Sequence, residues 1–257
     1  EGLWAQENEL TSLDLSNNTA LTRVHCDRNE LTHLNMRNGA TDQLTYFRAH
    51  NNSLTCIKVY AEDIDWATEN WTSDSSNIDV GVIFDTYCAP EGYTVVLDNN
   101  FEQALINLGY DDTLDELVLT ENISGVSSLD VRNQEISDLT GIEGFTALTE
   151  LQCDYNQLTS LDMSSNTALT RLQCNNNQLT ALDVSNNTVL DSLNCFFNQL
   201  TSLDVSANTA LTRLYCGFNS LTSLDVSSNT ALTLLNCFGG NQLTALDVST
   251  NTALSTL

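Results

Sequence analysis

The sequence is short of proline, glycine and basic residues. Its 257 residues include one Pro and 11 Gly, where average usage would give about 13 and about 18. Lys plus Arg number 8 against 34 Asp plus Glu, a formal net charge of −26 at pH 7. Phosphate binding depends on Lys and Arg, so this balance argues against nucleic acid and against an anionic membrane surface as partners. No apolar run approaches the ~18 residues of a membrane span, so we expect no direct membrane insertion.

The second half of the chain is an internal repeat. Cysteines at 153, 174, 195, 216 and 237 are each 21 residues apart, and each lies in a unit that reads LxxLxCxxNxLTxLDVSxNTA. Positions are counted from the first Leu of a unit, which is +0. Leu at +0, +3, +10 and +13, Cys at +5 and Val at +15 are predicted to point inward, and stacked coils would join them into one core. The Asn at +8 is predicted to form a buried ladder that satisfies backbone groups, which explains how the turns form without Pro.

This pattern resembles the leucine-rich repeat family, in particular the 21-residue bacterial class called IRREKO repeats. It is similar to the repeats of secreted or cell-surface internalin-like proteins. The resemblance implies an α/β-class repeat solenoid that is predominantly β, with short strands and few helices apart from a cap helix. It also implies that the residues around the LxC strand form a concave recognition face.

The repeats divide the chain into four segments. Residues 1–59 repeat less cleanly and are predicted to be the end of a first array. Residues 60–92 hold no repeat and are predicted to be its C-terminal cap and a linker. Residues 93–125 are predicted to form a helical N-terminal cap, with N-cap residues from Asp98 and a stop at Gly109. Residues 126–257 are a second, open-ended array. We expect the chain to be a piece of a longer protein, with end-to-end stacking as the alternative.

The eight cysteines fall into two groups. Six occupy the inward +5 position: Cys26, Cys153, Cys174, Cys195, Cys216 and Cys237. Neighbouring Cβ vectors would be parallel, so we expect small buried side chains and neither disulfides nor a metal site. Cys56 and Cys88 break the register and flank the cap, and we predict a disulfide between them. That bridge would place the protein in an oxidising, extracytoplasmic compartment, either secreted or at the cell surface.

Variation among the regular units concentrates at the outward positions +2, +4, +6 and +7. All aromatic residues after residue 147, and the two basic residues of the regular units, lie at these positions. They are the predicted ligand-binding residues of the second array: Tyr155, Arg171, Phe196, Phe197, Arg213, Tyr215, Phe218 and Phe238. Exposed aromatic residues in a row favour a contact site. The alternative is that the rings simply pack on one another.

The first array has a different outward surface. Its predicted ligand-binding residues are Trp4, Arg23, His25, Tyr46, Arg48 and His50. An indole among basic side chains suits a sugar ring, an acidic glycan or a carboxylate-bearing peptide. The alternative is a solvated face without a ligand.

Catalytic motifs are absent from the sequence: there is no Gly-rich phosphate loop, no HExxH and no exposed Cys beside a base. A column of Asp at 162, 183, 204, 225 and 247 favours a solubilising surface over a calcium site, because one carboxylate per coil supplies too few ligands. We therefore predict no enzyme, cofactor or metal. The predicted function is an extracellular binding scaffold or adhesin module for a protein or glycan. The alternative is a structural stalk or a fibre subunit that stacks end to end.

Overall fold

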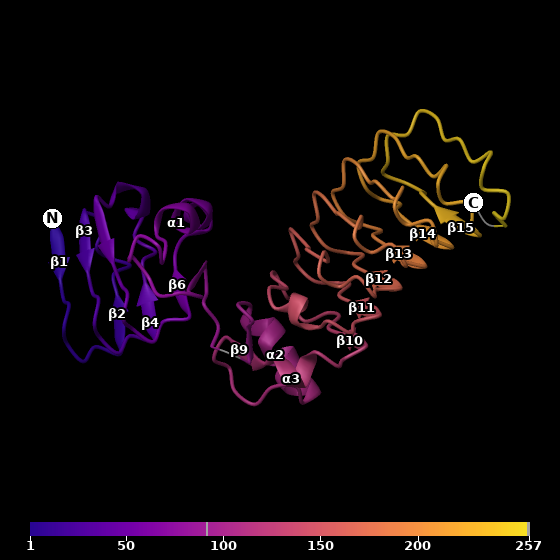
Figure 1. Ribbon diagram of the computed structural model, residues 1–257. Coiled ribbons are helices and arrows are strands. Elements are labelled where there is room, and N and C mark those ends of the chain that lie inside the picture. Colours follow the sequence, from indigo (N-terminus) through magenta and orange to yellow (C-terminus); the bar gives the residue numbers. More distant parts are fainter. Residues whose placement is uncertain (91, 256–257) are drawn as a thin grey trace. The chain divides into compact units, whose positions relative to one another are not determined.

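The computed structural model describes residues 1–90 and 92–255. The chain forms two compact units, Glu1–Cys88 and Ala89–Leu257 (Figure 1). Both units are built from three-residue strands joined by turns, with few helices. The predicted fold class, a predominantly β repeat solenoid, is confirmed.

The first unit contains two parallel sheets. One sheet has the order β1 (Gly2–Trp4), β3 (Arg23–His25) and β5 (Tyr46–Arg48). The other has the order β2 (Ser12–Asp14), β4 (His33–Asn35), β6 (Cys56–Lys58) and β7 (Ile83–Asp85). Strand pairing sets Leu3, Val24 and Phe47 side by side. A column of inward side chains of successive coils therefore becomes one core.

The segment after β6 packs against the last coil of this unit. It contains η2 (Ala61–Asp63) and α1 (Ile64–Asn70), while a short η1 (Thr41–Gln43) precedes β5. The buried Trp71 ring stacks on Phe47 with 4.0 Å between ring centres. Asn77 Nδ2 donates to the Phe47 carbonyl at 2.8 Å, and β7 pairs with β6. These contacts take the place of a further coil, which supports the cap role that we propose for this segment.

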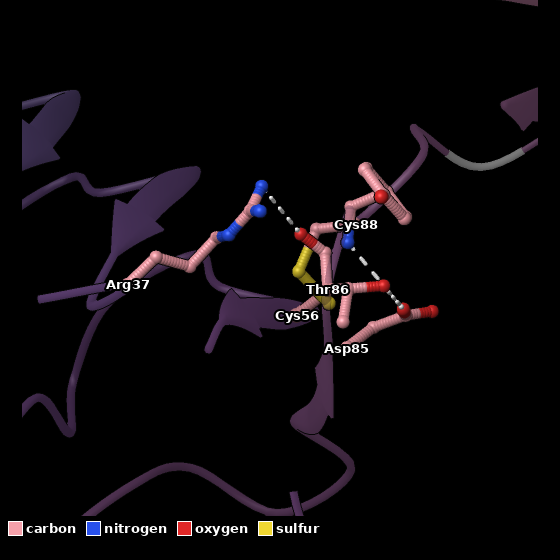
Figure 2. The surroundings of a disulfide bond; sticks show 6 residues. Arg37, Cys56, Asp85, Thr86 and Cys88 are labelled. Atoms are coloured by element: carbon pink, nitrogen blue, oxygen red, sulfur yellow. Dashed lines mark hydrogen bonds between the residues drawn. A yellow bond between two sulfur atoms is a disulfide. The ribbon is translucent and has the colours of Figure 1, made fainter. Parts of the chain in front are cut away.

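The predicted disulfide between Cys56 and Cys88 is present, with 5.5 Å between the Cα atoms. It joins β6 to the residues that follow β7 (Figure 2). Beside it, the Arg37 guanidinium lies 5.5 Å from the ring centre of Tyr87 and donates to the Thr86 carbonyl at 3.5 Å. The bridge and this cation–π contact both hold the end of the segment to the array.

The second unit opens with a hairpin and a helix. Strand β8 (Tyr93–Val95) pairs antiparallel with β9 (Leu117–Leu119), and α2 (Asn99–Leu108) lies between them in sequence. The Asp98 carboxylate accepts the first free N–H groups of α2, and Gly109 ends the helix with φ 80°. Both ends are where the sequence predicts them. A one-turn helix, α3 (Thr120–Ile123), follows β9.

Six parallel strands then stack in chain order (Figure 1). They are β10 (Ser128–Asp130), β11 (Glu150–Gln152), β12 (Arg171–Gln173), β13 (Ser192–Asn194), β14 (Arg213–Tyr215) and β15 (Leu234–Asn236). From β11 onward, pairing aligns each strand with the residue 21 positions later. The sequence period therefore equals one coil. A 3₁₀ turn, η3 (Ile142–Gly144), lies between β10 and β11, whose pairing aligns residues 22 positions apart.

The +5 cysteines form a ladder of free, buried thiols, except that Cys237 is only half-buried. The thiols of Cys153, Cys174 and Cys195 each donate to a carbonyl of the following coil, at Sγ–O distances of 3.4, 3.6 and 3.5 Å. Burial raises the pKa of these thiols well above its ordinary value, and that of Cys26 to about 12. The predicted role as small, neutral core residues is confirmed.

The +8 asparagines form the ladder that the sequence predicts. Asn177 Nδ2 donates to the carbonyls of Cys153 and Cys174, at 3.0 and 3.1 Å, while its Oδ1 accepts the Leu158 N–H at 3.0 Å. Asn198 and Asn219 repeat all three bonds. One side-chain amide thus satisfies backbone groups of its own coil and of the coil before it.

A second asparagine ladder, which our sequence analysis missed, lies at the NT turn of each unit. Asn187 is fully buried and its Nδ2 donates to the carbonyls of Met163 and Asn166, at 3.0 and 2.9 Å. The equivalent residues make the same bonds to the preceding coil: Asn208, Asn229 and Asn251. The sequence signal for this ladder is the Asn that recurs in the NT pair of every regular unit.

Replacing Asn187 by Ala should lower the free energy of unfolding of the second unit by about 1–3 kcal/mol, because two buried carbonyls each lose a donor. The adjacent Asn186 is exposed, and the next unit already carries an Ala at this position, Ala207. Asn186→Ala is therefore the matched control and should change stability by less than about 0.5 kcal/mol. Chemical denaturation measures both, and equal losses would show that the buried ladder contributes nothing specific.

Candidate functional site

The turn after each strand fixes an unusual backbone at +7. Nine residues at this position have positive φ, between 50° and 69°: Glu7, Arg28, Asn51, Asn133, Tyr155, Asn176, Phe197, Phe218 and Gly239. In most coils the +7 N–H donates to the +6 carbonyl of the following coil, as from Phe197 to Gly217 at 3.1 Å. This repeated hydrogen bond accompanies the positive φ. Left-handed backbone costs an ordinary L-residue roughly 1–2 kcal/mol, and Gly and Asn tolerate it best. Aromatic residues at this position are therefore energetically unfavourable.

Four phenylalanines form one surface cluster, the phenylalanine ridge: Phe196, Phe197, Phe218 and Phe238. Phe197 stacks on Phe218 with 4.3 Å between ring centres, and Phe196 meets both rings at 4.9 and 5.2 Å. Phe238 extends the ridge to the next coil, 5.7 Å from Phe218. Phe197 is 46% exposed and Phe238 is 72% exposed. The rings do pack on one another, yet the ridge still offers apolar surface to solvent.

Glycines of the following coils make room for the ridge. A Cβ built on Gly217 would collide with the Phe196 ring, and one on Gly239 would lie 2.7 Å from the Phe218 ring. The rings of Phe196 and Phe218 thus each lie over a glycine one coil further on. This complementarity fixes the positions of these two rings, at the turns after β13 and β14, and Phe238 follows β15.

The other predicted residues of the second array lie apart from the ridge. Arg171 pairs with Glu150 at 3.0 Å, and Arg213 pairs with Asp191 at 2.6 Å. Both arginines lie on strands, and the acidic partner of each lies in the preceding coil. These ion pairs largely neutralise the two positive charges. Tyr155 is 58% exposed and Tyr215 lies on β14. Within the described residues, neither tyrosine is in ring contact with the ridge.

The first unit brings its predicted residues into one stacked column, which consists of Trp4, His25, Tyr46 and Arg48. The rings of Trp4 and His25 are 6.1 Å apart at 18°, and those of His25 and Tyr46 are 4.4 Å apart at 12°. The Arg48 guanidinium lies 5.2 Å from the Tyr46 ring centre. Strand pairing of β1, β3 and β5 creates this column, because it sets Trp4, His25 and Arg48 side by side.

Polar groups border the stacked column. His25 Nδ1 lies 4.0 Å from the buried Asp27 carboxylate. Arg23 is paired in register with Tyr46, while His50 lies at +6. His50 Nδ1 and Gln6 Oε1 are buried without a hydrogen-bond partner. The structure therefore brings all six predicted residues of the first unit to one sheet or to the turn that follows it.

No group of three or more His, Cys, Asp or Glu side chains in the described parts of the chain is arranged to hold a metal ion. Within residues 1–90 and 92–255, no helix has the length and hydropathy to cross a membrane.

The Asp column is part of the turn structure. Each Asp accepts the N–H of the Ser two residues later at 2.9 Å, as in the pair Asp204 and Ser206. Side-chain and backbone hydrogen bonds from Ser206 lower the pKa of Asp204, and the pKa of Asp183 is lowered in the same way by Ser185. The carboxylates therefore have a structural use that the sequence analysis did not assign.

Comparison with known proteins identifies similar repeats. No family model matches the chain. Internalin J of Listeria monocytogenes serotype 4b (strain F2365) is 47% identical over 72 residues, which are 27% of this chain and 7% of that protein. A structure of the functional domain of InlJ from Listeria monocytogenes, described as including a cysteine ladder, is 30% identical with a TM-score of 0.48. It covers 100% of this chain, which spans 52% of that domain.

Two further structures show the fold. Internalin C2 of Listeria monocytogenes has a TM-score of 0.60 at 20% identity, over 65% of this chain and 77% of that one. A leucine-rich repeat protein of Leptospira interrogans has a TM-score of 0.50 at 21% identity, over 97% of this chain and 57% of that one. The stacked coils described above are therefore leucine-rich repeats.

Lowering the pH should destabilise the second unit below about pH 4. A carboxylate whose pKa is lowered on folding stabilises the native state above its ordinary pKa of 3.8. That contribution is lost as the pH falls through the folded-state value. Changing Asp183, Asp204 and Asp225 to Asn keeps the acceptor oxygen and removes the titration. The melting temperature of this variant should fall less steeply with pH, and an unchanged slope would contradict the assignment.

Tyr155→Asn should raise the free energy of unfolding by about 0.5–1 kcal/mol, because Asn adopts positive φ at lower cost. The following coil already carries Asn176 at this position with φ 56°. Tyr155→Ala removes the same ring but does not lower the cost of the positive φ. The Ala variant should therefore be less stable than the Asn variant. Thermal denaturation compares the two, and an Asn variant no more stable than the Ala variant would show that backbone strain at +7 is negligible.

Proposed function

We propose that this leucine-rich repeat protein, similar to the internalins, is a non-enzymatic binding scaffold that engages a protein partner through the phenylalanine ridge. The observation that carries the proposal is the placement of Phe197 and Phe218 at +7, with φ 51° and 50°. Asn or Gly would be cheaper there, as at Asn176 and Gly239. Residues held in an energetically unfavourable backbone conformation are typical of functional sites.

The chemistry of the ridge suits a protein surface. Its exposed rings, Phe197 and Phe238, provide apolar area that gains free energy when a partner removes it from water. Aromatic side chains are enriched in the cores of protein interfaces, and packing on neighbours pre-organises them at little entropic cost on binding. The mutual packing in the ridge is thus compatible with recognition.

A location outside the cytoplasm is supported by the Cys56–Cys88 bridge, because disulfides persist in oxidising compartments. The +5 thiols are compatible with such a compartment, since burial raises the pKa of Cys153 and Cys174 and limits access by oxidants. A secreted or surface-attached protein is our proposal, and it agrees with the likeness to internalin J.

A structural role is the second candidate. The pairing register is the same from β11 to β15, so the array forms a regular rod-like stack of coils within its unit. Such a stack suits a stalk or a subunit that associates end to end. Electron microscopy of the purified chain distinguishes the two: separate particles favour the scaffold, and filaments favour the fibre.

Replacing Phe197, Phe218 and Phe238 by Ser should weaken binding to a protein on an array of extracellular proteins and glycans by at least about tenfold. Val189→Ser is the matched control, because Val189 is apolar, 47% exposed and lies before β13 rather than after it. Binding to the array should be unchanged for this control. Circular dichroism checks that both variants fold, and full binding by a folded ridge variant would refute the proposal.

A further inference from the structure

We propose that the first unit holds a second, independent recognition site, at the stacked column of Trp4, His25, Tyr46 and Arg48. The ligand class is a carboxylate-bearing sugar, such as a hexuronic acid unit of an acidic glycan. This site does not depend on the phenylalanine ridge, which lies on the other unit.

Unpaired positive charge marks this face of the first unit. Four of the eight Lys and Arg side chains form ion pairs with Asp or Glu. Arg23 and Arg48 form none within 4.0 Å among the described residues, and both lie on the sheet of β1, β3 and β5. The chain as a whole has a net charge of −26. Two unpaired guanidinium groups on one sheet therefore form a local positive patch that attracts an anion. Charge complementarity therefore indicates a negatively charged ligand.

The stack prepares Arg48 to hold a carboxylate. Its guanidinium lies against the Tyr46 ring, which restricts the side chain before a ligand arrives. A guanidinium can donate two parallel hydrogen bonds to a carboxylate, which a neutral group cannot match. The rings of the column stack face to face, so they turn their electropositive edges outward beside the guanidinium. Edges and guanidinium together form a surface that suits an anion.

The groups around the column favour a sugar over an acidic peptide. Backbone groups of the sheet are already used: the His25 and Arg48 carbonyls accept the N–H groups of Ala5 and Cys26. A peptide laid on this face would thus find no main-chain partners of the kind that extended peptides use. The Trp4 indole lies at one end of the column and is 57% exposed. A sugar ring can pack its C–H groups against this indole, while its carboxylate and hydroxyls remain free to hydrogen-bond to Arg48 and to water.

Isothermal titration calorimetry of the folded chain tests the site with three probes: tetragalacturonate, a hyaluronan tetrasaccharide and the methyl ester of tetragalacturonate. At least one of the two acids should bind with a Kd of about 1 mM or lower. The neutral methyl ester should bind at least about tenfold more weakly, because it lacks the carboxylate. Failure of both acids, or equal binding of acid and ester, would overturn the proposal.

Arg48→Gln should weaken binding of the acid by at least about tenfold. Arg28→Gln is the matched control, since Arg28 lies close by at +7 but is already paired with Glu7. It should leave the affinity within about twofold, and an equal loss in both variants would contradict a specific clamp. The variant with three ridge substitutions should bind the acid normally, which separates this site from the ridge.

Hexaglutamate provides the last arm of the test. It carries carboxylates without sugar hydroxyls, so it should bind more weakly than the sugar acid. Equal or tighter binding would reassign the site to acidic peptides and reject the sugar.

Discussion

The side-chain amide of asparagine holds each coil of this protein to the coil before it. Strands of three residues supply few ladder bonds, and most of each coil is turn. Asn177 and its equivalents donate to carbonyls of two coils and accept an N–H from the earlier one. In the NT ladder, Asn187 donates instead to two carbonyls of the preceding coil, those of Met163 and Asn166. Buried backbone groups at these turns are thereby paired without Pro and with little Gly, although Oδ1 of Asn187 and of its NT equivalents is buried without a partner among the described residues.

The same arrangement decides where the coil can vary. Once the +8 side chain points inward and the +7 N–H bonds to the next coil, the +7 side chain lies on left-handed backbone. The expectation that +6 points outward is wrong in several coils, because Asp27, Asp154 and Asn175 are buried there. These turn tips are the places where Phe197, Phe218 and Phe238 are found. The interior repeats almost without change, while the proposed recognition surface lies at positions that the ladders leave free. The residues that stabilise a unit are therefore different from those that we propose for recognition.

Much of the fold follows from the sequence because the period of 21 residues states which side chains share a column. The inward cysteines and the Asn177 ladder follow from this register, and the Cys56–Cys88 bridge follows from the two cysteines that break it beside the cap. The positive φ at Phe218 could not be predicted, because it depends on a hydrogen bond to another coil. The ion pair of Arg213 with Asp191 was also hidden, since it depends on side-chain conformations across coils. The stacking of His25 on Tyr46 was missed for the same reason, although the residues themselves were predicted.

The most direct test of this account is amide hydrogen exchange at Leu158, Leu179 and Leu200. These three residues lie outside the strands, and each donates its N–H to the Oδ1 of an asparagine in the next coil. If the amide ladder closes the solenoid, they should exchange as slowly as the backbone N–H of Cys174, which bonds to the adjacent coil directly. Exchange as fast as that of exposed turn amides would contradict the central role of the asparagine ladder.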